Sequence, residues 1–170
     1  MVMKKRIFAA MLAVLCLTAA SCGTETKTPD ATAQEANVKE YTFDAGSVTT
    51  EVLAEIPINS AIEKGIADLE FYFTDLDTSK LTDASYYMCA SGAYPDEIGV
   101  FVFDTAESAA AAETAVKARL DKQVSVYESY TPEEMYKLED AIIDVKQNVI
   151  FYAVTENNSR AQEIFDSFIG

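Results

Sequence analysis

The sequence predicts an α+β fold: an antiparallel sheet of about four strands, with helices packed mainly on one face and further helices before the sheet. Two observations predict this class. Short apolar segments occur in pairs separated by turn residues, and longer segments with apolar residues at steps of three and four lie between and after these pairs. Hairpin pairs separated by helices favour an antiparallel sheet over a parallel one.

Two helices are expected before the sheet. The first carries apolar residues at helical spacing and ends before Pro57 (Val48, Val52, Leu53, Ile56). Ser60 and Glu63 match a capping box, which predicts a second helix. That helix would bury three apolar residues (Ile62, Ile66, Leu69). Residues 75–83 are polar and predict a loop or a single helical turn.

The first pair of strands is expected at residues 84–90 and 97–103. The segment between them, residues 91–96, is rich in turn-forming residues such as Gly92 and Pro95. Residues 97–103 are apolar almost throughout. An alternation of polar and apolar residues is therefore missing, which indicates a central strand covered on both sides.

A long helix is predicted after this strand, because Asp104 and Glu107 form a start signal. A stripe of residues at steps of three and four continues to Tyr127. Thr131 and Pro132 give a second start signal, for a short helix that ends near Leu138.

The last elements are a hairpin and a helix. Strands are expected at residues 141–145 and 149–154, and Asn148 suits the left-handed conformation of the tight turn between them. Ser159 and Gln162 predict the start of a final helix with four apolar residues on one face (Ala161, Ile164, Phe165, Phe168).

The N-terminus predicts export. Residues 1–6 are cationic, and an uncharged apolar run follows that is too short for a membrane-spanning helix. The run ends in small residues before Cys22, a pattern that resembles the lipobox of bacterial lipoproteins. We therefore expect a signal peptide at residues 1–21, cleavage before Cys22 and lipid attachment to Cys22. The alternative is an ordinary signal peptide with an incidental cysteine.

The mature chain is expected to consist of a lipidated, disordered tether at residues 22–40 and one domain at residues 41–170. Lipid on Cys22 would hold it at the outer face of the bacterial cytoplasmic membrane. Loss of the three basic residues of the signal would change the net charge from −15 to −18. Such an acidic protein is repelled by nucleic acid, so nucleic-acid binding is not expected.

The residue inventory limits the chemistry. The sequence contains no histidine, which excludes Ser-His-Asp and Cys-His catalysis and the usual transition-metal sites. Cys89 lies among apolar residues and is expected in the core. Asp75, Asp77 and Asp83 resemble a calcium loop only faintly, because the glycine and the final glutamate of that loop are missing. We expect no cofactor, no metal site and no enzymatic activity.

Four residues are candidates for binding. Asp96 and Glu97 are paired carboxylates at the start of a strand, although a pair that is isolated in the sequence more often serves turn formation. Tyr94 and Tyr130 are two of nine tyrosines, and exposed aromatic surfaces bind peptides and glycans. A buried role with one polar end is the alternative for these tyrosines.

The chain also resembles a known family. Four parts of the chain are similar to the domain-of-unknown-function family numbered four thousand three hundred and fifty-eight. They are the segment from Tyr94 through Asp96, Glu97 and Ile98, the long helix, the segment from Tyr130 through Pro132 to Glu139, and the closing hairpin. The resemblance covers residues 48–168. It departs at Gln147, where the family commonly has glycine. It implies a small bacterial envelope lipoprotein and no assigned activity.

Three functions remain open at this point. The first is a non-catalytic binding or interaction module of the cell envelope, whose partner is an unknown envelope protein or glycan. The second is a small-ligand receptor accessory to a transporter, which requires a deep pocket. The third is a glycan-acting enzyme that uses carboxylates only, which requires two carboxylates that converge in a cleft.

Overall fold

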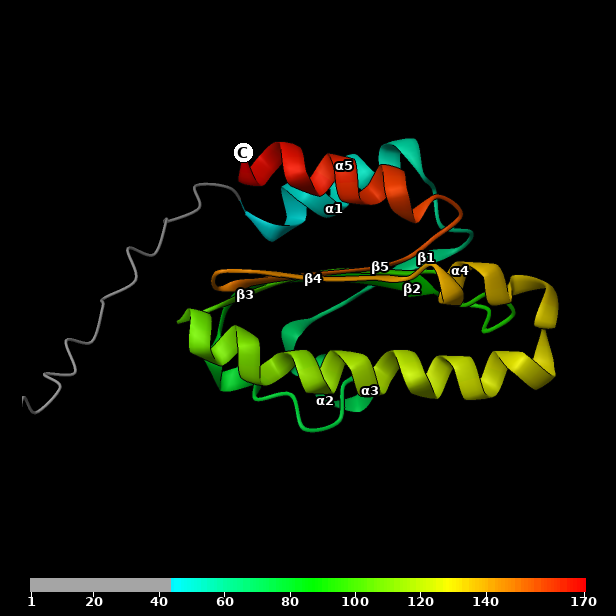
Figure 1. Ribbon diagram of the computed structural model, residues 1–170, viewed down its shortest axis with the longest axis horizontal. Helices are drawn as coiled ribbons and strands as arrows, with labels where there is room; N and C mark the ends of the chain where they lie inside the picture. The colour runs from blue at the N-terminus through cyan, green and yellow to red at the C-terminus, as the bar shows by residue number, and fades with distance from the viewer. Residues whose placement is uncertain (1–43) are drawn as a thin grey trace, which may run out of the picture. The chain divides into compact units, whose positions relative to one another are not determined.

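The computed structural model describes residues 44–170, which form an α+β domain built on an antiparallel sheet (Figure 1). Within these residues the sheet has five strands in the order β1-β2-β3-β5-β4. The strands are β1 (Ala61–Lys64), β2 (Leu81–Cys89), β3 (Glu97–Phe103), β4 (Ile142–Lys146) and β5 (Val149–Val154). The predicted signal peptide, Cys22, the whole predicted tether and residues 41–43 of the predicted domain lie outside the described residues.

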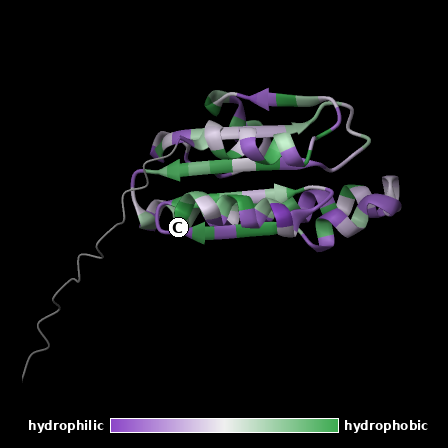
Figure 2. Cartoon of the chain, turned by 90° about the horizontal axis from the view of Figure 1, so that it is seen from above, coloured by the Kyte–Doolittle hydropathy of each residue, from purple (hydrophilic) through white to green (hydrophobic). Residues whose placement is uncertain are grey.

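Helices cover both faces of the sheet (Figure 1), and hydrophobic residues run along its strands (green in Figure 2). The α-helices are α1 (Ala45–Glu55), α2 (Leu69–Tyr72), α3 (Ala106–Tyr130), α4 (Met135–Glu139) and α5 (Asn158–Ile169). Single 3-10 turns precede α2, β2 and α4 (Ile66–Asp68, Thr78–Lys80, Pro132–Glu134). Helices α1 and α5 pack on one face, and α2 and α3 pack on the other. None of the helices between residues 44 and 170 is long and apolar enough to cross a membrane.

The core under α1 and α5 is formed by alternate residues of the central strands. Ile98 and Val100 of β3 and Phe151 of β5 are fully buried there. The Phe151 ring stacks on Phe165 of α5 with ring centroids 4.5 Å apart. Because an aromatic side chain buries roughly 150–250 Å², this stack contributes much of the attachment of α5.

The core under α2 and α3 is aromatic. Phe73, which follows α2, contacts the rings of Tyr86, Phe101 and Tyr152 edge-on. The Phe101 ring lies directly over Gly99 of the same strand, so a Cβ atom at Gly99 would come within 2.7 Å of it. Strand β3 is therefore central and buried on both faces, as the sequence predicts.

The predicted α+β class and antiparallel sheet are confirmed, with three differences in detail. The sheet has a fifth strand, β1, where the sequence predicts a helix starting at Ser60. Ser60 has a positive φ of 51° and forms a turn rather than a cap, and β1 pairs with the edge of β2. Tertiary pairing thus overrides the local capping pattern.

The second difference is that helices cover both faces rather than mainly one. The apolar character of β3 on both faces requires cover on both sides, and α1 with α5 supplies the second layer. The third concerns the β4–β5 turn, where Gln147 has the positive φ, 57°, instead of Asn148. The Asn148 side chain instead donates to the carbonyl oxygen of Phe103, 2.9 Å away.

Candidate functional site

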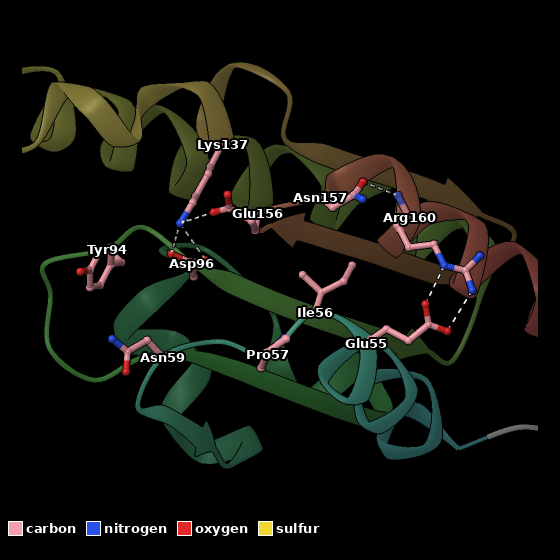
Figure 3. Close-up of a pocket in the computed structure, with 10 residues that line it drawn as sticks. All are labelled: Glu55, Ile56, Pro57, Asn59, Tyr94, Asp96, Lys137, Glu156, Asn157 and Arg160. Carbon is pink, nitrogen blue, oxygen red and sulfur yellow. Dashed lines mark hydrogen bonds and ion pairs between the residues drawn. The ribbon is translucent and has the colours of Figure 1, made fainter.

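A pocket of about 620 Å³ opens at one end of the domain, between segments that are far apart in the sequence (Figure 3). Its walls come from the end of α1 and the residues after it, the β2–β3 turn, α4, the β5–α5 connection and the first turn of α5. The volume lies in the range of small-ligand sites. Ile56 and Pro57 give it an apolar side, and the other lining residues are polar, charged or aromatic.

Lys137 of α4 and Asp96 of the β2–β3 turn form an ion pair in this pocket. Lys137 Nζ lies 3.0 Å from Asp96 Oδ2 and 3.2 Å from Oδ1. Lys137 is only 5% exposed and Asp96 only 7%. A charge removed from water to this extent is stable only with a partner, so each residue depends on the other.

Two more carboxylates and two aromatic rings surround the same ammonium group. Lys137 Nζ lies 2.8 Å from Glu134 Oε2 and 3.3 Å from Glu156 Oε2. The rings of Tyr94 and Tyr136 have their centroids 5.5 Å and 5.8 Å from it, which is within cation–π range. The Tyr136 hydroxyl donates to Glu156 Oε2 over 2.6 Å.

These contacts perturb the protonation of the groups involved. Burial alone would lower the pKa of Lys137, but the hydrogen bonds and charges of Glu134 and Asp96 raise it above its usual value. Burial raises the pKa of Asp96, and Lys137 opposes this change. The hydrogen bond from Tyr136 lowers the pKa of Glu156. Lys137 is thus held as an ammonium ion, which is neither a base nor a nucleophile.

The backbone around the pocket is fixed by polar anchors. The Tyr127 hydroxyl donates to the carbonyl oxygens of Gly92 and Tyr94, which holds the β2–β3 turn against α3. Asn158 accepts from the amide of Thr155, and its side-chain amide donates to the carbonyl oxygen of Lys137 over 2.9 Å. The turn, α4 and the start of α5 are therefore held in one arrangement around the Lys137–Asp96 pair.

A second ion pair lies at the other side of the opening. Arg160 donates to both carboxylate oxygens of Glu55 over 2.7 Å and 2.9 Å, and its third nitrogen donates to Glu163 over 2.8 Å. This pair links the end of α1 to α5. Arg160 and Glu55 are both partly exposed, so they form a rim rather than a floor.

The four predicted binding residues do not form one group. Tyr94 and Asp96 line the pocket. Glu97 is 1% exposed and lies in the interior, away from the pocket lining. Tyr130 is 67% exposed at the end of α3 and is likewise outside the lining. Alternation along the strand explains the split of the paired carboxylates, because successive side chains point to opposite faces.

Glu97 belongs to a buried polar cluster under α3. Arg119 donates to both of its carboxylate oxygens, with Nε 3.2 Å from Oε2, and Gln123 Nε2 donates over 2.7 Å. Burial raises the pKa of Glu97, and Arg119 opposes this change. The hydroxyls of Tyr86 and Tyr152 are buried without a hydrogen-bond partner among the described residues. Burial and the charge of Glu97 raise the pKa of both phenols.

Residues that sequence reasoning missed complete the pocket: Glu55, Lys137, Glu156 and Arg160. Lys137 lies within the predicted short helix, but no sequence pattern distinguishes it from a surface lysine. The other three are ordinary surface residues in the sequence, and only the packing of α1 and α5 brings them together.

The remaining sequence candidates are located as follows. Cys89 is buried, as predicted. Asp75 and Asp77 line a second pocket of about 440 Å³ beside the start of α3. Among residues 44–170, no group of three or more carboxylate or thiol side chains is arranged to hold a metal ion.

The fold and the pocket define a small α+β domain with a charged cleft. The family described as Domain of unknown function (DUF4358) matches residues 60–155, more than half of the chain, and the chain belongs to this family. The match covers Tyr94, Asp96 and Lys137 but ends before Glu156 and starts after Glu55. No curated protein and no solved structure matches the chain.

Proposed function

We propose that this chain is an extracytoplasmic lipoprotein, anchored by lipid on Cys22 at the outer face of the bacterial cytoplasmic membrane. We further propose that its α+β domain is a non-catalytic binding module of the cell envelope. The observation that carries the binding role is the convergence of four distant segments on one pocket around the buried Lys137–Asp96 pair.

The anchor is supported by the cationic start, the short apolar run and the small residues before Cys22. Two or three acyl chains on one residue would hold the protein durably, since each buried methylene contributes about 0.8 kcal/mol. The acidic chain would not be attracted to anionic membrane lipids, so the acyl chains on Cys22 have to supply the attachment.

The anchor is tested by comparing wild type with Cys22→Ser in the native bacterium. Mass spectrometry of the N-terminal peptide should show diacylglycerol on Cys22, and membrane fractionation should show the protein released in the variant. An unlipidated wild-type protein would contradict the anchor without affecting the binding proposal.

The binding role is supported by the polarity of the pocket and by its rigid frame. A buried ion pair contributes little net stability compared with apolar residues of similar volume. Its position in the wall of an open pocket, with an aromatic ring beside it, is typical of a site that orients a ligand. Lys137 is held as an ammonium ion and Cys89 is buried, so neither is available as a nucleophile.

The binding role is tested by capture from solubilised native envelopes with the full chain as bait. Tyr94→Ala removes an aromatic wall of the pocket, and Tyr130→Ala is the matched control outside it. A component retained by wild type and Tyr130→Ala but lost with Tyr94→Ala supports the pocket as the binding site. Loss with Tyr130→Ala alone would place the binding surface elsewhere, and capture of no component would contradict the binding role.

A carboxylate-only enzyme is the second candidate, and one observation favours it. Asp96 and Glu156 both contact Lys137 Nζ, so two carboxylates converge in the pocket, with pKa values shifted in opposite directions. This is the arrangement expected of an acid and a base. Release of reducing ends from envelope glycans, abolished by Glu156→Gln, would establish it in place of a binding module.

A small-ligand receptor is a further candidate, because the volume of the pocket lies in the range of small-ligand sites. Such a receptor would be accessory to a transporter. Ligand uptake that depends on this protein in cells would distinguish it from an interaction module.

A further inference from the structure

We propose that the pocket accepts a cationic group, specifically the primary ammonium at the end of an alkyl chain. This inference rests on the proposed binding role and adds the chemical class of the ligand. It is carried by the charges that remain once the ion pairs of the pocket are assigned and by the aromatic and apolar walls beside them.

The first cation of the lining already has more carboxylates than it can neutralise. Asp96, Glu134 and Glu156 all lie within 3.3 Å of Lys137 Nζ. Glu156 is the member open to solvent, because its side chain is 68% exposed at the pocket opening whereas the side chain of Asp96 is 10% exposed. A ligand ammonium can therefore share Glu156 without breaking the buried pair.

Arg160, the second cation of the lining, is also paired with carboxylates. All three nitrogens of the Arg160 guanidinium donate to carboxylates, two to Glu55 and one to Glu163. Each nitrogen of the two cations therefore already has a carboxylate beside it. An anionic ligand would meet these carboxylates at close range.

The surplus charge sets the preference of the pocket. Three carboxylates and two cations line the pocket, which gives the lining a formal net charge of −1, and Glu134 and Glu163 add two further carboxylates in contact with these cations. A concave site with one sign of charge concentrates ligands of the opposite sign. The rest of the acidic chain strengthens this preference.

The uncharged walls fit the alkyl part of such a ligand. Ile56 and Pro57 form an apolar side, and Tyr94 and Asn59 lie at the same end of the pocket (Figure 3). The π-face of a tyrosine attracts ammonium groups, and Tyr94 already does so for Lys137. An alkylammonium of lysine length would place methylenes on the apolar side and its charge near Glu156.

The test is calorimetric titration of the full chain in mild detergent with three matched probes. Cadaverine carries two ammonium groups, Nα-acetyl-lysine methylamide carries one on a peptide-like unit, and glutarate is a dianion of the same chain length as cadaverine. We expect saturable binding of at least one amine and none of glutarate, with affinity that falls as salt rises. Binding of cadaverine alone indicates a free diamine, and binding of the lysine derivative indicates a peptide-borne side chain.

The variants separate the pocket from a general charge effect. Glu156→Gln should weaken amine binding about fivefold, the size of one partly exposed ion pair. Glu163→Gln also removes one negative charge, from a residue that pairs with Arg160 but lies outside the lining. It should change the affinity for the amine less than twofold. Both residues are exposed, so neither variant threatens folding.

Equal losses in the two variants, binding of glutarate, or no binding of either amine would overturn the assignment of a cationic ligand. The binding role itself is judged separately, by envelope capture with Tyr94→Ala, which does not depend on the charge of the ligand.

Discussion

Arg119 of α3 and Glu97 of β3 form an ion pair in the interior of the domain, where they are 8% and 1% exposed. Gln123 donates a further hydrogen bond to the same carboxylate. This pair connects the longest helix to the central strand through charge rather than through apolar packing. Both donors to the Glu97 carboxylate named here lie on α3, so removal of the pair has consequences that can be measured.

Arg119→Met should lower the free energy of unfolding by about 3–5 kcal/mol, because it leaves the Glu97 carboxylate buried and unpaired. Urea denaturation measures this change. The control is Lys117→Met, which breaks the exposed pair with Glu113 and should cost less than about 0.5 kcal/mol. Similar losses in the two variants would show that the buried pair has no special role.

The same variant should have a characteristic pH dependence. Without Arg119 the largest opposition to the effect of burial is lost, so the pKa of Glu97 in the folded state should rise further above its unfolded value. A carboxyl with a raised folded pKa favours folding below its unfolded pKa, and this contribution is lost as pH rises through the folded pKa. The deficit of Arg119→Met relative to wild type should therefore be smallest near pH ~4 and grow toward neutrality. A deficit that is constant with pH would contradict this assignment.

Gly99→Ala should destabilise the domain by about 1–3 kcal/mol, because the new Cβ would overlap the buried Phe101 ring. Thermal or urea unfolding provides the measurement. Gly65→Ala is the matched control, since the nearest atom to its Cβ would be Asp68 Oδ2 at 3.9 Å. If both alanines are tolerated equally, the close packing of the Phe101 ring over Gly99 is contradicted.

Tyr136 should titrate with a pKa of about 12, because its hydroxyl donates to the negatively charged Glu156. The ultraviolet absorbance of tyrosinate, compared between wild type and Tyr136→Phe, isolates this group. Since the folded pKa is raised, the contribution of this hydrogen bond to stability is present below the unfolded pKa of about 10 and is lost as pH rises through 12. Glu156→Gln should return the Tyr136 pKa toward its ordinary value, and an unchanged pKa in that variant would rule out Glu156 as the cause.

Much of the fold follows from local signals in the sequence. The lack of alternation in residues 97–103 identifies the central strand, and the apolar stripe from Ala109 to Tyr127 identifies α3. Strand β1 escapes prediction because its four residues carry little local preference and are held by pairing with β2. That pairing is a long-range contact, and the capping pattern at Ser60 gives no indication of it.

The pocket follows from the sequence only in part. Asp96 and Tyr94 can be predicted because they lie among turn-forming residues directly before a strand. Glu55 and Arg160 are 105 positions apart, and no periodicity connects them. Their meeting depends on α1 and α5 packing on the same face of the sheet, which the prediction of helices mainly on one face did not specify.

The central claim is that this pocket binds a component of the cell envelope, and site-specific photo-crosslinking in the native bacterium tests it most directly. A photo-reactive residue in place of Asn59, an exposed lining residue, should yield a discrete adduct. The same residue in place of Glu128, which is exposed outside the pocket, should yield none. An adduct from Asn59 that disappears with Tyr94→Ala is the result the structure predicts. No adduct from Asn59, or equal adducts from both positions, would contradict the claim.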